Sequence, residues 1–413
     1  MTMLANTDLA ERELRTEPTV ASGRARTLQT ILFVLALGGI LTAGLWPFHS
    51  PKNDVTWLPA GRGLSFGAYG TILSSGVFSG TNPGDGAPCT LEMWVESYLP
   101  WDTSTLLAFY DPETHKQFSL HQSLTNLELR NSRRLTRDKT NRVGVSHFYI
   151  DSIFRQGKLV FITITSSGNQ TRVYVDGVLA AEASQFPLSA DDFNGELVIA
   201  NSPVHNDSWE GWFRGLAIYQ SELTPEQVLQ QYEAWTRDGR TATTADGRNV
   251  ALYLFDEREG NIIHNRVKSE VDLNIPERYT VFDEKFLEPP WDEYYPNWSY
   301  LKDVLINIAG FIPLGFVANA FLSFVARVRR AALFTVLVGC ATTLTIEILQ
   351  AFLPTRDSGT TDLITNTVGT CLGAAIYHYR PVRTLYFAIL EQLSSLRLRE
   401  LPPGGWHGSA SQP

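Results

Sequence analysis

The chain of 413 residues is long enough for two or three domains, and its formal net charge of −9 argues against nucleic acid as a partner. Cys89 stands alone in a long polar segment, and Cys340 and Cys371 lie in apolar runs, so no disulfide framework is expected. The sequence has no C-x-x-C or H-E-x-x-H motif, and we expect no metal cofactor apart from the calcium considered below.

Four apolar runs are long enough to cross a bilayer, which takes roughly 20 residues of helix. They predict transmembrane helices at about 28–46 (a first span within 27–48), 304–325, 332–352 and 363–379. Buried helices of a soluble protein are the alternative, but three such runs in close succession are hard to bury in a water-soluble core. We expect the charge-balanced residues 1–26 to form a disordered cytoplasmic tail.

Clusters of arginines flank the apolar runs on one side, whereas Arg356 stands alone in the loop on the other side. They precede the first run, fill the turn between the second and third, and follow the fourth: Arg24, Arg26, Arg327, Arg329, Arg330, Arg380 and Arg383. By the positive-inside rule, both termini, including a tail at 381–413, are cytoplasmic, and residues 50–300 lie outside. A cleaved signal peptide is the alternative for the first run, although no convincing A-x-A site follows it.

The segment at 55–277 has the pattern of an all-β domain with many short strands. Leu159–Thr165 and Gln170–Val175 are rich in strand-forming residues and flank Ser-Ser-Gly-Asn, which predicts a hairpin. One short helix is expected at Thr224–Tyr232, where the first residue is the N-cap and Gln227 completes a capping box.

Several stretches of this segment resemble the laminin-G-like, concanavalin A-like family over about 60–275. The likeness rests on Leu91–Val95, Arg172–Gly177, Trp212–Tyr219, Leu223–Glu226 and Ala251–Asn261. The resemblance implies a jelly-roll β-sandwich. It implies little about function, because sugar binders, protein binders and hydrolases share this fold.

Hydrolases of this fold have two catalytic carboxylates on one strand, and Glu92 and Glu96 are the nearest match. Trp94 stands where the central Asp belongs, so we interpret this strand as part of the core and expect no glucanase activity. Indoles stack on sugar rings, and the candidates are Trp101, Trp209 and Trp212, although we favour a place in the core over a sugar contact for each of them. Calcium needs oxygen ligands, and the candidates, which form no compact acidic loop, are Asp102, Asp111, Asp207 and Glu210.

Residues 278–302 join this segment to the second apolar run. They are rich in aromatic residues: Trp291, Tyr294, Tyr295, Trp298 and Tyr300. Such residues concentrate where a membrane meets water, so the segment is predicted to be an interfacial linker.

The pattern D-x-x-x-N-x-x-G occurs twice, at Asp303–Gly310 and Asp362–Gly369. Its Asp, Asn and Gly fall on one face of a helix, and finding the set twice indicates an internal repeat. The end of the first apolar run, Ile40–Pro47, resembles the end of the third, Ile348–Pro354. We therefore predict two parallel helical hairpins, with the sandwich inserted between the first and second helices.

Together with Phe311–Gly315, Glu347–Gln350 and Pro354–Arg356, the repeat resembles the VanZ-like family of bacterial membrane proteins over 300–380. The resemblance implies a four-helix membrane bundle, built from 303–380 and the first helix, in a bacterial envelope. It supplies no biochemical activity.

The predicted topology brings the polar residues of these motifs to one depth in the outer leaflet: Asp303, Asn307, Glu347, Gln350, Arg356, Asp362 and Asn366. We expect Glu347 to pair with Arg356. Glycines expected at close helix contacts are Gly310, Gly315, Gly369 and Gly373. The cluster is either a polar knot that orients the helices or a pocket for a lipid head group, which Arg356 would bind.

These features predict a multidomain, multi-pass protein of the bacterial inner (cytoplasmic) membrane with an extracytoplasmic sandwich. Its expected partners are membrane lipid and an envelope glycan or protein. The preferred hypothesis is non-enzymatic. The alternative is an enzyme acting on a lipid-linked or peptidoglycan-derived substrate, with Glu347 or Asp362 as general base, although the motif has no nucleophilic Ser, Cys or His. A pure scaffold is also compatible.

Overall fold

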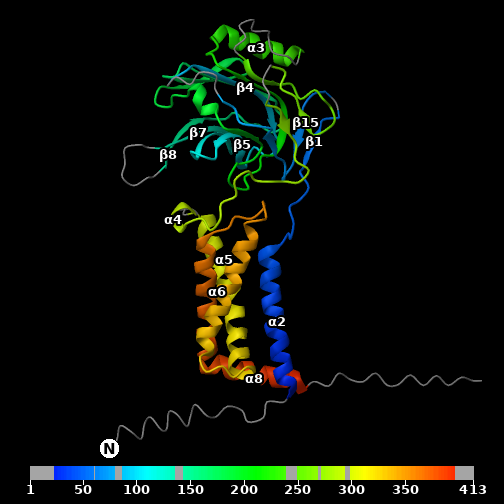
Figure 1. Ribbon diagram of the computed structural model, residues 1–413, viewed down its shortest axis with the longest axis vertical. Coiled ribbons are helices and arrows are strands. Elements are labelled where there is room, and N and C mark those ends of the chain that lie inside the picture. Colours follow the sequence, from blue (N-terminus) through cyan, green and yellow to red (C-terminus); the bar gives the residue numbers. More distant parts are fainter. Residues whose placement is uncertain are drawn as a thin grey trace, which may run out of the picture. The chain divides into compact units, whose positions relative to one another are not determined.

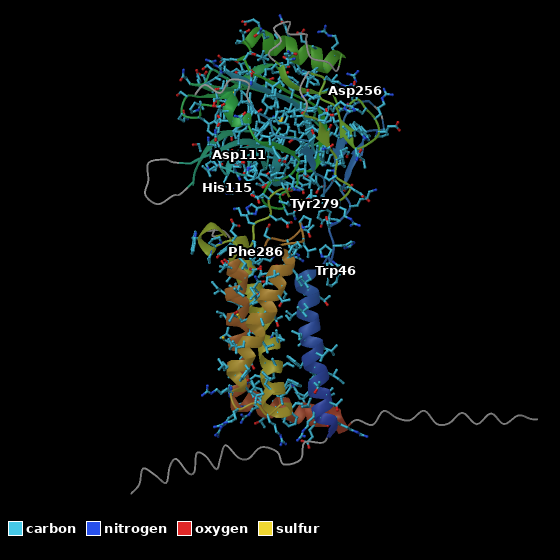
Figure 2. The ribbon with its side chains drawn as sticks, viewed as in Figure 1. Trp46, Asp111, His115, Asp256, Tyr279 and Phe286 are labelled. Atoms are coloured by element: carbon cyan, nitrogen blue, oxygen red, sulfur yellow. The ribbon has the colours of Figure 1, made fainter. Side chains whose placement is uncertain are left out.

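The computed structural model describes residues 23–395, apart from Ala60 and residues 80–85, 135–142, 239–248, 268–270 and 294–297. The chain divides into two compact units. One comprises Met1–Trp46, Leu287–Gln350 and Ser358–Pro413, and the other comprises Pro47–Phe286 and Ala351–Asp357. Figure 2 labels Trp46 and Phe286, which end the first stretch of each unit. Most of the predicted tails, and Tyr294 and Tyr295 of the predicted linker, lie outside the described residues.

The second unit is a β-sandwich of two antiparallel sheets, as predicted (Figure 1). The first sheet has the order β1 (Val55–Trp57), β2 (Leu64–Phe66), β13 (Gly211–Tyr219), β4 (Cys89–Ser97), β9 (Val160–Ser166), β10 (Thr171–Val175) and β11 (Val178–Ala183), with β14 (Asn249–Tyr253) also paired to β13. The second has the order β15 (Ile262–Ile263), β16 (Leu273–Asn274), β3 (Ile72–Ser74), β12 (Glu196–Ile199), β5 (Thr103–Asp111), β6 (Lys116–Ser123), β7 (Asn126–Arg134) and β8 (Val143–Ile150). A short 3₁₀ helix, η1 (Ala190–Phe193), precedes β12.

The main core fills the space between the sheets. On β4, Leu91, Met93 and Val95 are buried in it, because alternate side chains of a strand point to the same face. Leu107 and Phe109 on β5 are buried in the same core. The predicted hairpin forms between β9 and β10.

The outer face of the first sheet is covered by α3 (Pro225–Asp238), which Figure 1 shows above β4. A second small core forms there around Trp235 and Tyr219. The capping box is confirmed: the Gln227 amide donates to Thr224 Oγ1 at 3.3 Å, and the Thr224 amide donates to Gln227 Oε1 at 2.9 Å.

The two chain ends of the sandwich lie side by side. Lys52 and Arg278 form an antiparallel bridge. The Asn53 amide donates to the Glu277 carbonyl at 3.2 Å, and the Tyr279 amide donates to the Pro51 carbonyl at 3.0 Å. The two ends of the β-sandwich segment therefore meet at one place, as an inserted domain requires.

The first unit is helical, with α2 (Gly23–Leu45), α4 (Pro290–Glu293), α5 (Trp298–Ala320), the π-helical turn η2 (Phe321–Val325), α6 (Ala331–Gln350), α7 (Thr360–His378) and α8 (Arg380–Ser395). Within it α5 packs against α2, α6 and α7. Three segments are long and apolar enough to cross a membrane: Gly23–Leu45, Tyr300–Val325 and Ala331–Gln350. The fourth predicted segment forms α7, which contains Asp362, Asn366 and several threonines, and a four-helix transmembrane bundle stays a prediction.

The contact between α5 and α7 is close because glycines replace side chains there. A Cβ at Gly369 would overlap the Ile308 carbonyl, and one at Gly373 would overlap the Ile312 carbonyl. A Cβ at Gly315 would overlap the Thr370 carbonyl. The expectation for Gly310 was wrong, because a Cβ there would meet nothing within 4 Å.

The segment 381–395, expected to be part of a tail, belongs to α8. Tyr386 and Phe387 pack this helix against Phe316 and Phe324 of α5 and η2. Tyr386 also donates a hydrogen bond to Gln29 on α2.

Candidate functional sites

The two copies of the repeat bond to each other. Asn307 Nδ2 on α5 donates to Asp362 Oδ1 in the first turn of α7 at 2.7 Å. The Asn of the first copy thus contacts the Asp of the second. A carboxylate in the first turn of a helix also interacts favourably with the helix dipole.

Glu347, near the end of α6, is almost fully buried and forms the cap of α7. Its Oε2 accepts the Gly359 amide at 2.9 Å, and Gly359 is the N-cap residue of α7. Its backbone carbonyl accepts Ser358 Oγ at 3.0 Å. Backbone N–H groups at a helix start lack partners within the helix, so an acceptor is stabilising there.

Two carboxamides complete these helix contacts. Asn366 Nδ2 on α7 donates to Thr343 Oγ1 on α6 at 2.9 Å, and Gln350 Nε2 on α6 donates to the Gly44 carbonyl on α2 at 2.8 Å. Within the described part of the chain, Asn366 Oδ1 and Gln350 Oε1 are buried without a hydrogen-bond partner. Each of the five polar residues of this helix cluster therefore bonds to a helix or helix cap other than its own: Glu347, Gln350 and Asn366, which are buried, and Asn307 and Asp362, which are half-buried.

Two predicted members lie apart from these bonds. Asp303 is exposed on the first turns of α5. Arg356 lies in Ala351–Asp357, which belongs to the sandwich unit, and its pairing with Glu347 stays a prediction.

A second polar group lies on the outer face of the second sheet, on β7 and β8. Glu128 is 1% exposed; its carboxylate accepts hydrogen bonds from Arg130 at 2.8 Å and from His147 Nδ1 at 2.7 Å. The His147 ring stacks on Tyr149 with centroids 6.1 Å apart and planes at 5°. We call Glu128, Arg130, His147 and Tyr149 the Glu128 cluster. Its carboxylate is buried, whereas its aromatic and cationic groups reach the surface, with Tyr149 53% exposed.

The electrostatics of this cluster keep the carboxylate ionised. Burial acts to raise the pKa of Glu128, but hydrogen bonds from Arg130, Tyr149 and His147 outweigh it and lower the pKa to about 2. His121, opposite Glu128 on β6, has its pKa lowered to about 3, mainly by burial and then by Arg130. The neutral His121 ring bonds Thr105 and Ser119.

The three tryptophan candidates differ in exposure. Trp209 is a correction: it is 1% exposed in the core, where its indole donates to Gln122 at 2.8 Å, so it has no face for a sugar. Trp212 is half-buried beneath the Arg214 guanidinium at 5.3 Å. Trp101 is 61% exposed.

The hydrolase-like carboxylates Glu92 and Glu96 lie on β4, and α3 covers this strand at Glu92. Glu92 is fully buried beneath α3, where its Oε2 accepts Tyr219 Oη at 2.9 Å and Trp235 Nε1 at 3.2 Å. Trp94 is partly buried against the same core. Glu92 is therefore out of reach of a substrate.

Two of the calcium candidates accept hydrogen bonds from neighbouring residues. Asp207 accepts Thr105 Oγ1 at 2.5 Å, and Asp111, labelled in Figure 2, accepts the Glu113 amide at 3.0 Å. In the ranges that the structure describes, no group of three or more His, Cys, Asp or Glu side chains could hold a metal ion.

Two features define the class of this protein: an inserted β-sandwich and a unit of long apolar helices with a polar cluster. A model of the VanZ/LLP1 family matches residues 251–383, and a model of the concanavalin A-like lectin/glucanases superfamily matches residues 72–229. The chain thus contains a VanZ/LLP1 region and a concanavalin A-like domain, as predicted. No curated protein matches the chain.

Solved structures resemble the sandwich at low identity. A putative carbohydrate binding protein from Bacteroides ovatus aligns at 11% identity and a TM-score of 0.36, over 55% of this chain and 58% of its own, less than two thirds. A heptameric SAP-like pentraxin from Limulus polyphemus aligns at 12% identity and 0.32, over 56% and 97%. The CBM40 of a Ruminococcus gnavus IT-sialidase, bound to alpha2,3 sialyllactose, aligns at 10% identity and a TM-score of 0.28, over 34% of this chain and 80% of its own.

Proposed function

We propose that this protein is a non-enzymatic, multi-pass protein of the bacterial cytoplasmic membrane whose external sandwich binds an envelope glycan. The observation that supports this most directly is the Glu128 cluster. A buried, ionised carboxylate fixes a guanidinium and a stacked His–Tyr pair at the surface. An aromatic face suits the apolar face of a sugar ring, and the neighbouring N–H groups suit its hydroxyls or carboxylates.

The family match supports the same proposal. The sandwich belongs to a superfamily named for lectins and glucanases, and Glu92 is buried where a glucanase would need an exposed carboxylate. Glu92 lies on the other sheet from the Glu128 cluster, so we propose that the sandwich binds a glycan at the Glu128 cluster and does not hydrolyse it.

In the membrane, we propose that α7 is the fourth span and that the helix cluster lies in the outer leaflet. Its bonds link α2, α5, α6 and α7, which supports the knot interpretation over an open head-group pocket. Placing Asp362 and Asn366 in a spanning helix is feasible because both side chains have partners on other helices.

The proposal predicts that Tyr149→Ala weakens glycan binding about tenfold or more, because stacking is lost while Glu128 and Arg130 keep their bond. Binding of the purified full chain to an array of bacterial envelope saccharides, including peptidoglycan fragments, measures this. Trp101→Ala tests the other exposed aromatic candidate, which lies outside the cluster; if the Glu128 cluster is the site, this variant should leave binding unchanged. Loss of binding in Trp101→Ala alone, or no glycan bound by the wild type, contradicts the proposal.

A further inference from the structure

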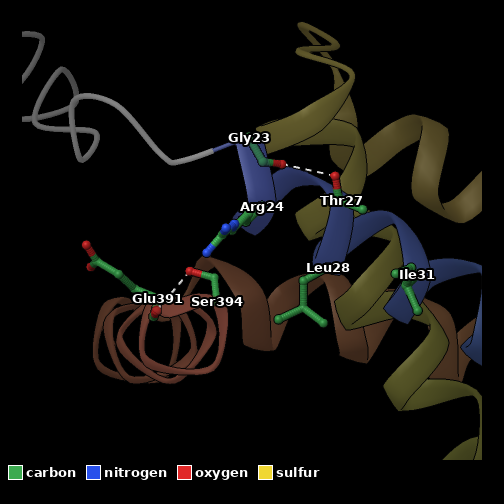
Figure 3. Close-up of a pocket in the computed structure, with 7 residues that line it drawn as sticks. All are labelled: Gly23, Arg24, Thr27, Leu28, Ile31, Glu391 and Ser394. Atoms are coloured by element: carbon green, nitrogen blue, oxygen red, sulfur yellow. Dashed lines mark hydrogen bonds between the residues drawn. The ribbon is translucent and has the colours of Figure 1, made fainter. Parts of the chain in front are cut away.

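A groove of about 920 Å³ lies between the N-terminal end of α2 and the C-terminal end of α8 (Figure 3). Its lining includes Arg24, Thr27, Leu28 and Ile31 from α2, and Glu391 and Ser394 from α8. The helix cluster and the Glu128 cluster do not include any of these residues. The groove is therefore separate from both sites described above.

The groove has one cation and one anion. Figure 3 shows Arg24 extended toward α8, and Glu391 lies on that helix. Among the residues that the structure places, neither Arg24 nor Glu391 has an ion-pair partner. The two hydroxyls are occupied by backbone acceptors: Thr27 donates to the Gly23 carbonyl at 3.1 Å, and Ser394 donates to the Glu391 carbonyl at 2.8 Å. The charged groups of the groove thus remain available to a ligand with both signs of charge.

The groove continues into an apolar face of α2. Leu28, Ile31 and Leu35 follow each other at i, i+3 and i+7, so they share one side of the helix, and Leu35 is 64% exposed. The Gly23–Leu45 segment is long and apolar enough to cross a membrane, and Arg24 stands at its end. A charged side chain at the end of a spanning helix, such as Arg24, lies at the depth of the lipid head groups.

The neighbouring helix has the form of an in-plane membrane helix. Leu385, Ile389 and Leu393 repeat every four residues on α8, and each is about half exposed or more. Leu390, on another side, is buried against the bundle. Exposed apolar residues on an amphipathic helix favour a position in the interface plane, which puts Glu391 at the same depth as Arg24.

We propose that this groove binds one zwitterionic glycerophospholipid with a primary ammonium group. The phosphate contacts the Arg24 guanidinium, the ammonium donates to the Glu391 carboxylate, and one acyl chain follows Leu28, Ile31 and Leu35. A guanidinium binds phosphate oxygens with two N–H groups, and a primary ammonium has N–H donors that a quaternary one lacks. The site therefore distinguishes ethanolamine from choline and from glycerol head groups.

Native mass spectrometry of the full chain in detergent tests this, with added phosphatidylethanolamine, phosphatidylcholine or phosphatidylglycerol of identical acyl chains. The wild type should bind phosphatidylethanolamine about five- to tenfold more tightly than either other lipid. Glu391→Gln should remove that preference, and Arg24→Gln should weaken binding of all three lipids.

Arg26→Gln is the matched control, because it removes the same charge from the same helix end without lining the groove. It should leave both affinity and preference unchanged. Equal binding of the three lipids by the wild type, or an Arg26→Gln effect as large as that of Arg24→Gln, overturns the proposal.

Discussion

Glu92 is a carboxylate whose surroundings disfavour a charge. It lies beneath α3 without exposed surface, and burial raises its pKa to about 7, against the opposing effect of its bonds to Tyr219 and Trp235. An unfolded chain releases this proton near its ordinary pKa of 4.5, whereas the folded protein holds it until about pH 7. The folded state binds more protons in that window, so Glu92 makes stability fall as the pH rises through it.

Glu92→Gln should therefore abolish the loss of folding stability that the wild type shows as the pH rises from about 4.5 to about 7. Glutamine keeps an acceptor oxygen for Tyr219 and Trp235 without a charge, so the variant should gain roughly 1–3 kcal/mol over the wild type at pH 8. At pH 5 the two proteins should differ little. Thermal unfolding of the purified full chain, followed by tryptophan fluorescence at both pH values, measures this. Parallel pH curves for the two proteins would show that Glu92 is not the titrating group.

Individual residues differ in how far sequence determines their role. Thr224 and Gln227 could be assigned as a capping box because the bonds join neighbours three residues apart. Asn307 and Asp362 could be singled out by the repeat, but their mutual bond could not be predicted, because it joins helices 55 residues apart in sequence. The Glu128 cluster could not be predicted either, because its members lie on two strands and meet only through the register of β7 and β8.

At the scale of elements, alternation and apolar length predicted most of the fold. The ends of α5, α6 and α7 lie within about six residues of the predicted ends, counting η2 as part of the first. The amphipathic α8 was missed because its mixed polar and apolar residues have no long apolar run. Trp209 lies in the core, which was the favoured interpretation, but the sequence left it a candidate sugar platform, because a tryptophan in a strand-rich segment can face the core or the surface.

The contact between α5 and α7 gives a prediction with an internal control. Gly369→Ala and Gly373→Ala would each push a methyl group against a backbone carbonyl of α5 and should cost about 1–3 kcal/mol. Gly310→Ala adds the same methyl group to open space and should be neutral or slightly stabilising, since alanine favours helices. Thermal unfolding in detergent compares the three variants. Equal losses in all three would mean that helix propensity or detergent, and not close packing, sets the effect.

At the scale of the whole molecule, the sandwich is an insertion between α2 and the short α4 that precedes α5 in the other unit. The bridge between Lys52 and Arg278 holds its two ends together, so the domain adds to the chain without separating α2 from α5. Gln29, whose Nε2 donates to the Val317 carbonyl at 3.0 Å, and Gln350, bonded to Gly44, fasten α2 to α5 and α6. The helical unit is thus assembled from segments more than 200 residues apart in sequence.

The membrane topology of the helical unit can be tested by cysteine labelling. Single cysteines are placed at Glu113, Arg329, Asp357 and Thr384, all exposed, in a chain whose own three cysteines are replaced. Arginines beside the apolar runs predict that Glu113 and Asp357 lie outside and the other two inside. An impermeant maleimide should therefore label the first pair in intact spheroplasts and the second pair only after permeabilisation. Asp357 and Thr384 flank α7, so labelling of both from outside would mean that α7 does not cross. The reverse pattern at all four positions would invert the orientation and place the Glu128 cluster in the cytoplasm, where an envelope glycan could not reach it.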